Sequence, residues 1–103
     1  MYLVFDVGAT FIKYALIDND GNISGKDKMP TERYSKEGVP GFVAKIKRVY
    51  DKVSVDNDIV GIAMALPGQI DVERGIVYGG GGVKYLDGAH LGDLISEACG
   101  GVR

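Results

Sequence analysis

The sequence predicts an α/β domain whose mixed sheet opens with three antiparallel strands and which contains at least two helices. Two apolar runs, Tyr2–Phe5 and Phe11–Ile17, flank a very short turn, which is typical of two strands joined in a hairpin. Between Pro40 and Lys52 the apolar residues recur at the three-and-four spacing of an amphipathic helix. The near-continuous apolar run Ile59–Leu66 is typical of a buried strand.

Length and composition favour a single globular domain with no internal boundary. The chain has 103 residues, of which 46% are hydrophobic and 25% charged, so it can bury a small but sufficient core. A net charge of -2 and a pI near 5.2 leave no basic surface for nucleic acid. Cys99 is the single cysteine, which excludes an internal disulfide and a zinc site built from paired cysteines of this chain.

No targeting segment is visible in the sequence. A strand pattern follows Met1 directly, without a charged leader and an apolar signal segment. No apolar run approaches the roughly 20 residues that a membrane-spanning helix needs. We therefore expect a cytoplasmic protein without a membrane partner.

The turn between the first two strands carries residues suited to a metal-bound phosphate. Asp6 ends the first strand and offers the hard oxygen ligand that Mg²⁺ accepts. Gly8 can adopt backbone conformations closed to other residues and leaves room for an anion against the N–H groups of the turn, and Thr10 adds a hydroxyl donor. An ordinary hairpin turn is the alternative, because Asp and Gly are common in turns. Neither P-loop spacing nor a dinucleotide fingerprint is present.

The middle of the chain predicts a third strand, a loop and a helix. The turn Asn19–Asn22 leads into a strand at Ile23–Met29, and the polar stretch Pro30–Gly38 reads as an exposed loop of unknown function. Pro40 suits the first turn of the helix. The apolar face of this helix comprises Phe42, Val43, Ile46, Val49, Tyr50 and Val53. Its basic residues lie mainly on the other face, where we expect a solvated surface: Lys45, Lys47, Arg48 and Lys52.

The apolar run Ile59–Leu66 is expected to lie in the covered middle of the sheet. It ends abruptly at Pro67-Gly68. Ligands of α/β sheets bind beyond the carboxyl ends of such strands, so Leu66–Gln69 stands where a substrate would bind. A plain turn before the next strand is the alternative.

The last third of the chain predicts a second hairpin and a second helix. Gln69–Val72 and Ile76–Tyr78 form the hairpin, and the glycine run Gly79–Gly82 serves either close backbone approach or motion. A helix at about Ala89–Cys99 ends at Gly100-Gly101, and Val102-Arg103 resembles the start of another strand. Near the start of this helix, His90 is expected to be a partly exposed residue without a role as a base or metal ligand.

These motifs, in this order, resemble the ROK family of bacterial sugar kinases and sugar-responsive repressors, within the actin, sugar-kinase and Hsp70 superfamily. The resemblance rests on D-x-G-x-T-x-x-K, on G-I-A-M-A-L-P-G-Q-I-D followed by G-I-V-Y-G-G-G-G, and on the helix ending C-G-G-V-R. It implies a ribonuclease H-like (actin-like ATPase) lobe, with residues 1–103 forming the N-terminal lobe of a longer two-lobe kinase. The family usually has glycine at the position of Ala9, where a methyl group is tolerable if φ is negative.

The resemblance also implies roles for individual residues. Asp6 would hold Mg²⁺, and Lys13 would support the hairpin by its charge near the phosphates. The ATP phosphate and Mg²⁺ site would comprise Asp6, Gly8, Ala9, Thr10 and Lys13. The sugar pocket would be lined by Gly68, Gln69 and Gly81.

The resemblance implies that the full-length protein is a glucokinase-like enzyme that phosphorylates a hexose or amino sugar with ATP, and it allows a homodimer. The catalytic aspartate, in an N-D pair on the strand after the last helix, the cysteine-rich zinc motif and the adenine-binding loop are expected beyond Arg103. The catalytic residue is thus absent from this portion, which is expected to be inactive alone. A sugar-responsive repressor is the alternative, although its DNA-binding module would precede the hairpin that begins at Tyr2. Another actin-like ATPase lobe is a third possibility.

Overall fold

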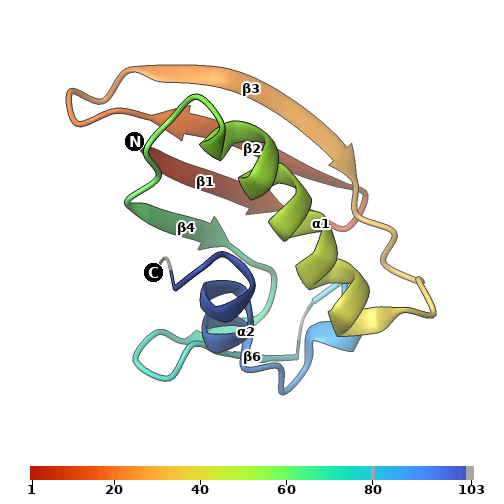
Figure 1. Cartoon of the computed structure of the whole chain (residues 1–103). Coiled ribbons are helices and arrows are strands. Elements are labelled where there is room, and N and C mark those ends of the chain that lie inside the picture. The colour runs from red at the N-terminus through yellow and green to blue at the C-terminus, as the bar shows by residue number, and fades with distance from the viewer. Residues whose placement is uncertain (80, 102–103) are drawn as a thin grey trace.

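A four-stranded mixed sheet forms the centre of the molecule (Figure 1). The structure, a computed structural model, describes residues 1–79 and 81–101. The strands are β1 (Tyr2–Val7), β2 (Phe11–Ile17), β3 (Ile23–Pro30) and β4 (Gly61–Ala65), in the order β3-β2-β1-β4. β1, β2 and β3 pair antiparallel, and β4 lies parallel to β1. The predicted antiparallel opening and mixed sheet are confirmed.

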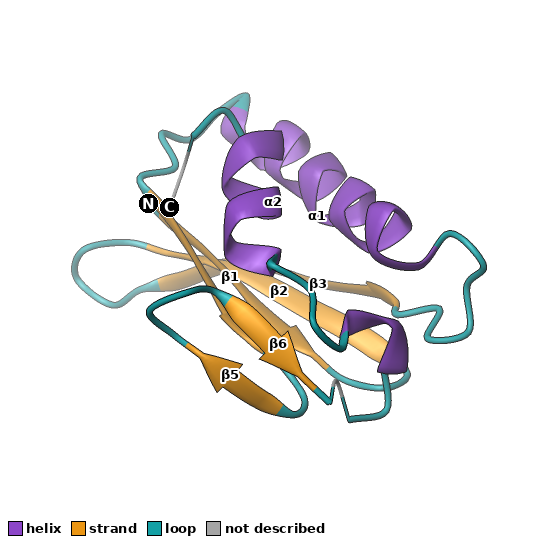
Figure 2. Cartoon of the chain, turned by 90° about the horizontal axis from the view of Figure 1, so that it is seen from below, coloured by secondary structure: helices purple, strands orange, loops and turns teal. Residues whose placement is uncertain are grey.

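Two helices cover one face of this sheet, as Figure 2 shows. They are α1 (Gly38–Ser54) and α2 (Leu91–Ala98). A separate hairpin is formed by β5 (Gln69–Asp71) and β6 (Ile76–Tyr78), and a 3₁₀ turn, η1 (Lys84–Leu86), precedes α2. We did not predict η1, because three residues are too few to show a period.

The main core lies between α1 and the sheet. Phe42, Ile46 and Val49 are the buried residues of α1, as the apolar spacing predicted. The sheet contributes buried side chains from alternate positions of β1 and β2: Leu3, Phe5, Val7, Ile12 and Leu16. Alternation on the strands and the three-and-four spacing on the helix place both apolar faces in one layer.

The basic face of α1 is solvated except at one position. Lys47, Arg48 and Lys52 are exposed, as predicted. Lys45 departs from that prediction, because only 14% of its side chain is exposed and its ammonium group contacts the loop after β3. A long lysine side chain can leave the polar face of a helix when backbone carbonyls lie within its reach.

β4 is an edge strand of the described sheet, so the prediction that it lies in a covered middle position is wrong. Its one partner among the described residues is β1. Because the helices cover one face alone, the alternate side chains of Ala63 and Ala65 are exposed on the other. That uncovered face continues over Val4 and Ile17, which line a shallow hollow there. Val102-Arg103, where a further strand was expected, lie outside the described residues.

Within the described residues, no helix combines the length and apolar character that crossing a bilayer demands.

Candidate active site

The turn between β1 and β2 is very tight. The Gly8 N–H donates a hydrogen bond to the Phe11 carbonyl at 2.9 Å, which leaves Ala9 and Thr10 at the tip. A Cβ atom on Gly8 would lie 3.1 Å from the Phe11 oxygen. Glycine is therefore favoured here by close approach. Gly8 does not have positive φ, so it does not adopt a backbone conformation that is closed to other residues.

The tip of the turn presents donors that suit an anion. Among the described residues, the N–H groups of Ala9 and Thr10 and the Thr10 hydroxyl donate no hydrogen bond, whereas the Gly8 N–H is already used. Glu32 is the one non-glycine residue of the described chain with positive φ, so the methyl group of Ala9 is accommodated without strain. Ala9 and Thr10 also line a hollow of about 500 Å³.

Asp6 and Lys13 are directly opposite each other in the register of β1 and β2, so their side chains share one face of the sheet. Both residues are exposed, and no ion pair joins them among the described residues. Asp6 also pairs in register with Ala65 at the end of β4. Its carboxylate thus stands near the edge where two parallel strands end, the usual place for ligands of α/β sheets.

The residues predicted for the sugar pocket come together at the same end of β4. Gly68 has φ +94° and Gly81 has φ +52°, a region that strongly favours glycine. A Cβ atom on Gly81 would lie 2.7 Å from the Pro67 Cβ and 3.5 Å from the Gly68 nitrogen. Gln69 follows as an exposed residue that begins β5. The glycine run therefore serves close backbone approach at Gly81, while its member Gly80 lies outside the described residues.

The glycine run also reaches the turn between β1 and β2. A Cβ atom on Gly82 would lie 2.8 Å from the Ala9 Cβ and 3.8 Å from Nη1 of Arg33. Gly81 contacts Pro67 while Gly82 contacts Ala9, so the two predicted sites are neighbours. Residues 73 positions apart in the sequence thus meet at one end of the sheet.

The loop between β3 and α1 contributes residues that sequence reasoning missed. Glu32, Arg33, Tyr34 and Ser35 line the hollow together with the tip of the turn. The Arg33 guanidinium lies 4.9 Å from the centre of the Tyr34 ring, a geometry typical of a cation–π contact. The Arg33 guanidinium can donate to a phosphate, while the carboxylate of Glu32, which also lines the hollow, lies 3.3 Å from the Lys45 ammonium group. The loop has no periodicity and no motif, so nothing in its sequence signalled this position.

His90 and Cys99 lie apart from these contacts. His90 is exposed at the N-cap position of α2, as expected. No three His, Cys, Asp or Glu side chains of the described chain gather in a metal-binding cluster. Cys99 is buried, and burial raises the pKa of its thiol, which disfavours the reactive thiolate.

Comparison with known proteins identifies the family. A sequence model of the ROK family matches residues 2–99. The glucokinase of Halalkalibacterium halodurans is 29% identical over 91 residues, which cover 84% of this chain and 27% of that protein. The chain spans about a third of the length of the curated relatives that it matches.

Solved structures share the fold. A ROK family glucokinase from Streptomyces griseus, in complex with glucose and AMPPNP, superposes with a TM-score of 0.80 at 21% identity, over 96% of this chain and 30% of that chain. A ROK family transcriptional regulator, a homologue of the E. coli MLC protein, gives a TM-score of 0.81 at 23% identity, over 96% of this chain and 25% of that one. A glucokinase and a transcriptional regulator thus share the fold of this chain. With its family match across residues 2–99, the chain belongs to the ROK family.

Proposed function

We propose that this chain is the N-terminal, phosphate-binding lobe of an ATP-dependent kinase that phosphorylates a hexose or an amino sugar in the cytoplasm. The observation that supports this most strongly is the approach of Gly82 to Ala9. A phosphoryl transfer site must hold the phosphate donor beside the sugar hydroxyl. In this contact the glycine run, which carries a residue of the predicted sugar pocket, lies against the turn between β1 and β2, which we assign to the phosphates.

The residues of the turn fit a nucleotide phosphate. The N–H groups of Ala9 and Thr10 and the Thr10 hydroxyl donate to no described residue, so they are free to donate to phosphate oxygens. Arg33 lines the hollow at the tip of the turn, whereas Lys13 lines a separate hollow beside Asp6 and adds positive charge at the same end of the sheet. Successive backbone N–H groups in a turn form a concavity that binds anions.

Asp6 fits the metal of a Mg²⁺–ATP complex. Its carboxylate is exposed and forms no ion pair within the described chain, so both oxygens can accept a metal ion or its waters. When bound, Mg²⁺–ATP supplies the phosphoryl group and much of the charge stabilisation for its transfer. Asp6 would hold the metal ion and so fix the position of its positive charge.

The predicted sugar pocket, formed by Gly68, Gln69 and Gly81, consists of backbone and one polar side chain. Gly68 and Gly81 bring two backbone segments close together, and Gln69 offers an exposed amide for hydrogen bonds to sugar hydroxyls. The base that removes the hydroxyl proton is expected beyond Arg103. Since transfer depends on an oriented nucleophile as well as a phosphate site, the 103-residue chain alone should not phosphorylate sugars.

The test measures ATP-dependent phosphorylation by the full-length protein on a panel of hexoses and amino sugars. We expect turnover of at least one sugar, and we expect the substitution Asp6→Ala to reduce kcat by at least about a hundredfold, since it removes a metal ligand. The matched control is Asp56→Ala, which alters an exposed aspartate beyond the end of α1. An Asp6→Ala enzyme with normal turnover at saturating sugar and Mg²⁺–ATP would refute the assignment of Asp6.

A regulator would give a different result. It would bind a sugar in isothermal titration without any turnover of ATP. The sequence after Arg103 separates the two functions independently, because an N-D pair followed by C-x-C-G-x-x-G-C favours the kinase.

A further inference from the structure

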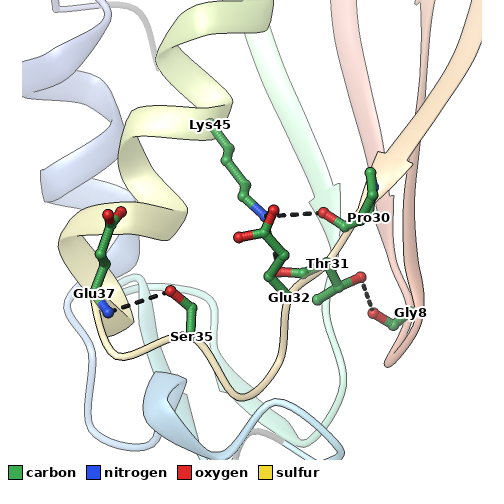
Figure 3. Close-up of polar contacts among 7 residues, drawn as sticks. All are labelled: Gly8, Pro30, Thr31, Glu32, Ser35, Glu37 and Lys45. Carbon is green, nitrogen blue, oxygen red and sulfur yellow. Dashed lines mark hydrogen bonds and ion pairs between the residues drawn. The ribbon is translucent and has the colours of Figure 1, made fainter.

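Lys45 ties helix α1 to the loop that follows β3 (Figure 3). Its ammonium group donates hydrogen bonds to the carbonyls of Pro30 at 2.9 Å and Thr31 at 3.2 Å. It also lies 3.3 Å from Oε1 of Glu32. These contacts hold the backbone on both sides of Thr31. With 14% of the lysine side chain exposed, they are partly shielded from water.

Thr31 also holds residues 8–10, the turn between β1 and β2 that the proposed function assigns to phosphate and that is called the phosphate turn below. It is the one buried polar residue of the described chain, at 0% exposure. Its hydroxyl donates to the Gly8 carbonyl at 2.7 Å, and its N–H donates to the Thr10 carbonyl at 2.9 Å. Thr31 therefore contacts residues on both sides of the tip at Ala9.

The contact with Gly8 has a consequence for an anion at the turn. The Gly8 carbonyl and the Ala9 N–H belong to the same peptide group, which is planar and trans, so the two point in opposite directions. A hydrogen bond that fixes the carbonyl also fixes the direction of the N–H. The Ala9 N–H is one of the donors that the turn offers to a phosphate.

We propose that Thr31 and Lys45 are positioning residues: Thr31 orients the Ala9 N–H of the phosphate turn, and Lys45 holds Thr31 in place from helix α1. The role in nucleotide binding rests on the proposed function of this turn. Neither residue contacts the phosphate. Both residues restrict the conformations of the turn before a nucleotide binds. Less conformational entropy is then lost on binding, so the affinity is higher.

The first experiment compares Thr31→Val with Thr31→Ser in the full-length protein. Valine keeps the shape but removes the hydroxyl, whereas serine restores a donor. We expect Thr31→Val to weaken Mg²⁺–ATP binding by about tenfold in isothermal titration, the order of one lost hydrogen bond, and Thr31→Ser to stay within about twofold of the wild type. The titrations are run well below the melting temperatures of all variants, so a loss of stability alone leaves the Kd unchanged.

Lys45 has a matched control on its own helix. Lys45→Met removes the ammonium group that holds the loop. Lys47→Met removes one that is exposed and pairs with Asp51. We expect Lys45→Met to weaken Mg²⁺–ATP binding at least threefold and Lys47→Met to leave it unchanged. Equal effects of the two substitutions would overturn the role of Lys45.

A second readout separates this proposal from the proposed function. In protein labelled with ¹⁵N-alanine, the order parameter of the Ala9 N–H reports the rigidity of the turn without any nucleotide. We expect it to fall in Thr31→Val and to recover in Thr31→Ser. If wild-type protein binds no Mg²⁺–ATP, the proposed function fails, yet a loosened Ala9 in Thr31→Val still supports the positioning role. If Ala9 stays rigid in Thr31→Val, or if a binding-competent protein keeps its affinity in that variant, the positioning role is wrong.

Discussion

The substitution Gly82→Ala tests whether the glycine run and the phosphate turn meet. The added Cβ would lie 2.8 Å from the Ala9 Cβ, whereas ordinary contacts lie at 3.4–4 Å. One segment must therefore move by about 0.6 Å or more. Ala9 cannot rotate its methyl group away, because Cβ is fixed to the backbone. Gly82 lacks positive φ, so the change tests packing without adding backbone strain.

The expected cost follows from two opposing effects. Overpacking of this kind costs about 1–3 kcal/mol. Replacing glycine by alanine stabilises the folded state by about 0.4–1 kcal/mol, because it lowers the conformational entropy of the unfolded chain. We expect Gly82→Ala to lower the free energy of unfolding by about 1–2 kcal/mol. Ala9→Gly removes the opposing methyl group, and the nearest remaining atoms would then be 3.8 Å from the new Cβ.

The assay is a double-mutant cycle read by urea unfolding, with circular dichroism as the signal. Ala9→Gly alone should cost about 0.5–1 kcal/mol through backbone entropy. In the double variant, Gly82→Ala should be neutral or stabilising, which gives a coupling energy of about 1–3 kcal/mol. If the two changes add within about 0.5 kcal/mol, Gly82 and Ala9 do not touch. The main observation that places the predicted phosphate and sugar sites next to each other would then be wrong.

Three further predictions concern the core and two titratable groups. Ile46→Ala empties a fully buried site on α1 and should lower the free energy of unfolding by about 2–5 kcal/mol in urea; a loss below about 1 kcal/mol would contradict the core described above. Hydrogen bonds to Asp18 from Asn22 and from the Asp20 N–H lower the pKa of its carboxyl below the ordinary value. The stability that Asp18 contributes is therefore complete above its unfolded pKa and disappears as pH falls through the lowered folded pKa. Asp18→Asn should therefore flatten the acid limb of a stability–pH profile, and an unchanged limb would disprove this. Because burial raises the pKa of the Cys99 thiol, iodoacetamide should modify it far more slowly at neutral pH in the folded chain than in urea, and equal rates would contradict its burial.

The elements that the sequence predicted well are those set by local patterns. The spacing of Phe42, Ile46 and Val49 predicted the buried face of α1, and Pro40 lies in its first turn. The turn after Ile17 predicted the start of β3 at Ile23. Such patterns are visible because each face repeats along one segment.

The parts of the site that escaped prediction depend on contacts between distant segments. Lys45 lies at a polar helix position, where solvation is the usual outcome, and its main partners are backbone carbonyls that carry no sequence signal. Thr31 stands in a loop without a motif, although it is buried beneath the turn at Gly8. The roles of the predicted site residues stay predictions, but the structure brings Gly81, Gly68 and Ala9 into one neighbourhood.

The uncovered edge at β4 has a consequence for how such a protein is synthesised. The opposite edge strand, β3, carries Lys26, Asp27 and Lys28, and charges of this kind discourage pairing with a second chain. β4 has the sequence GIAMA without a single charge. If the proposed kinase has the length of the curated relative of which this chain covers 32%, roughly twice the length of this chain would remain to be translated, which takes on the order of 10–40 s at 5–20 residues per second. During that interval the uncharged edge of β4, unpaired within the described residues, is accessible to other chains. We therefore expect chaperones to bind the nascent chain at this edge.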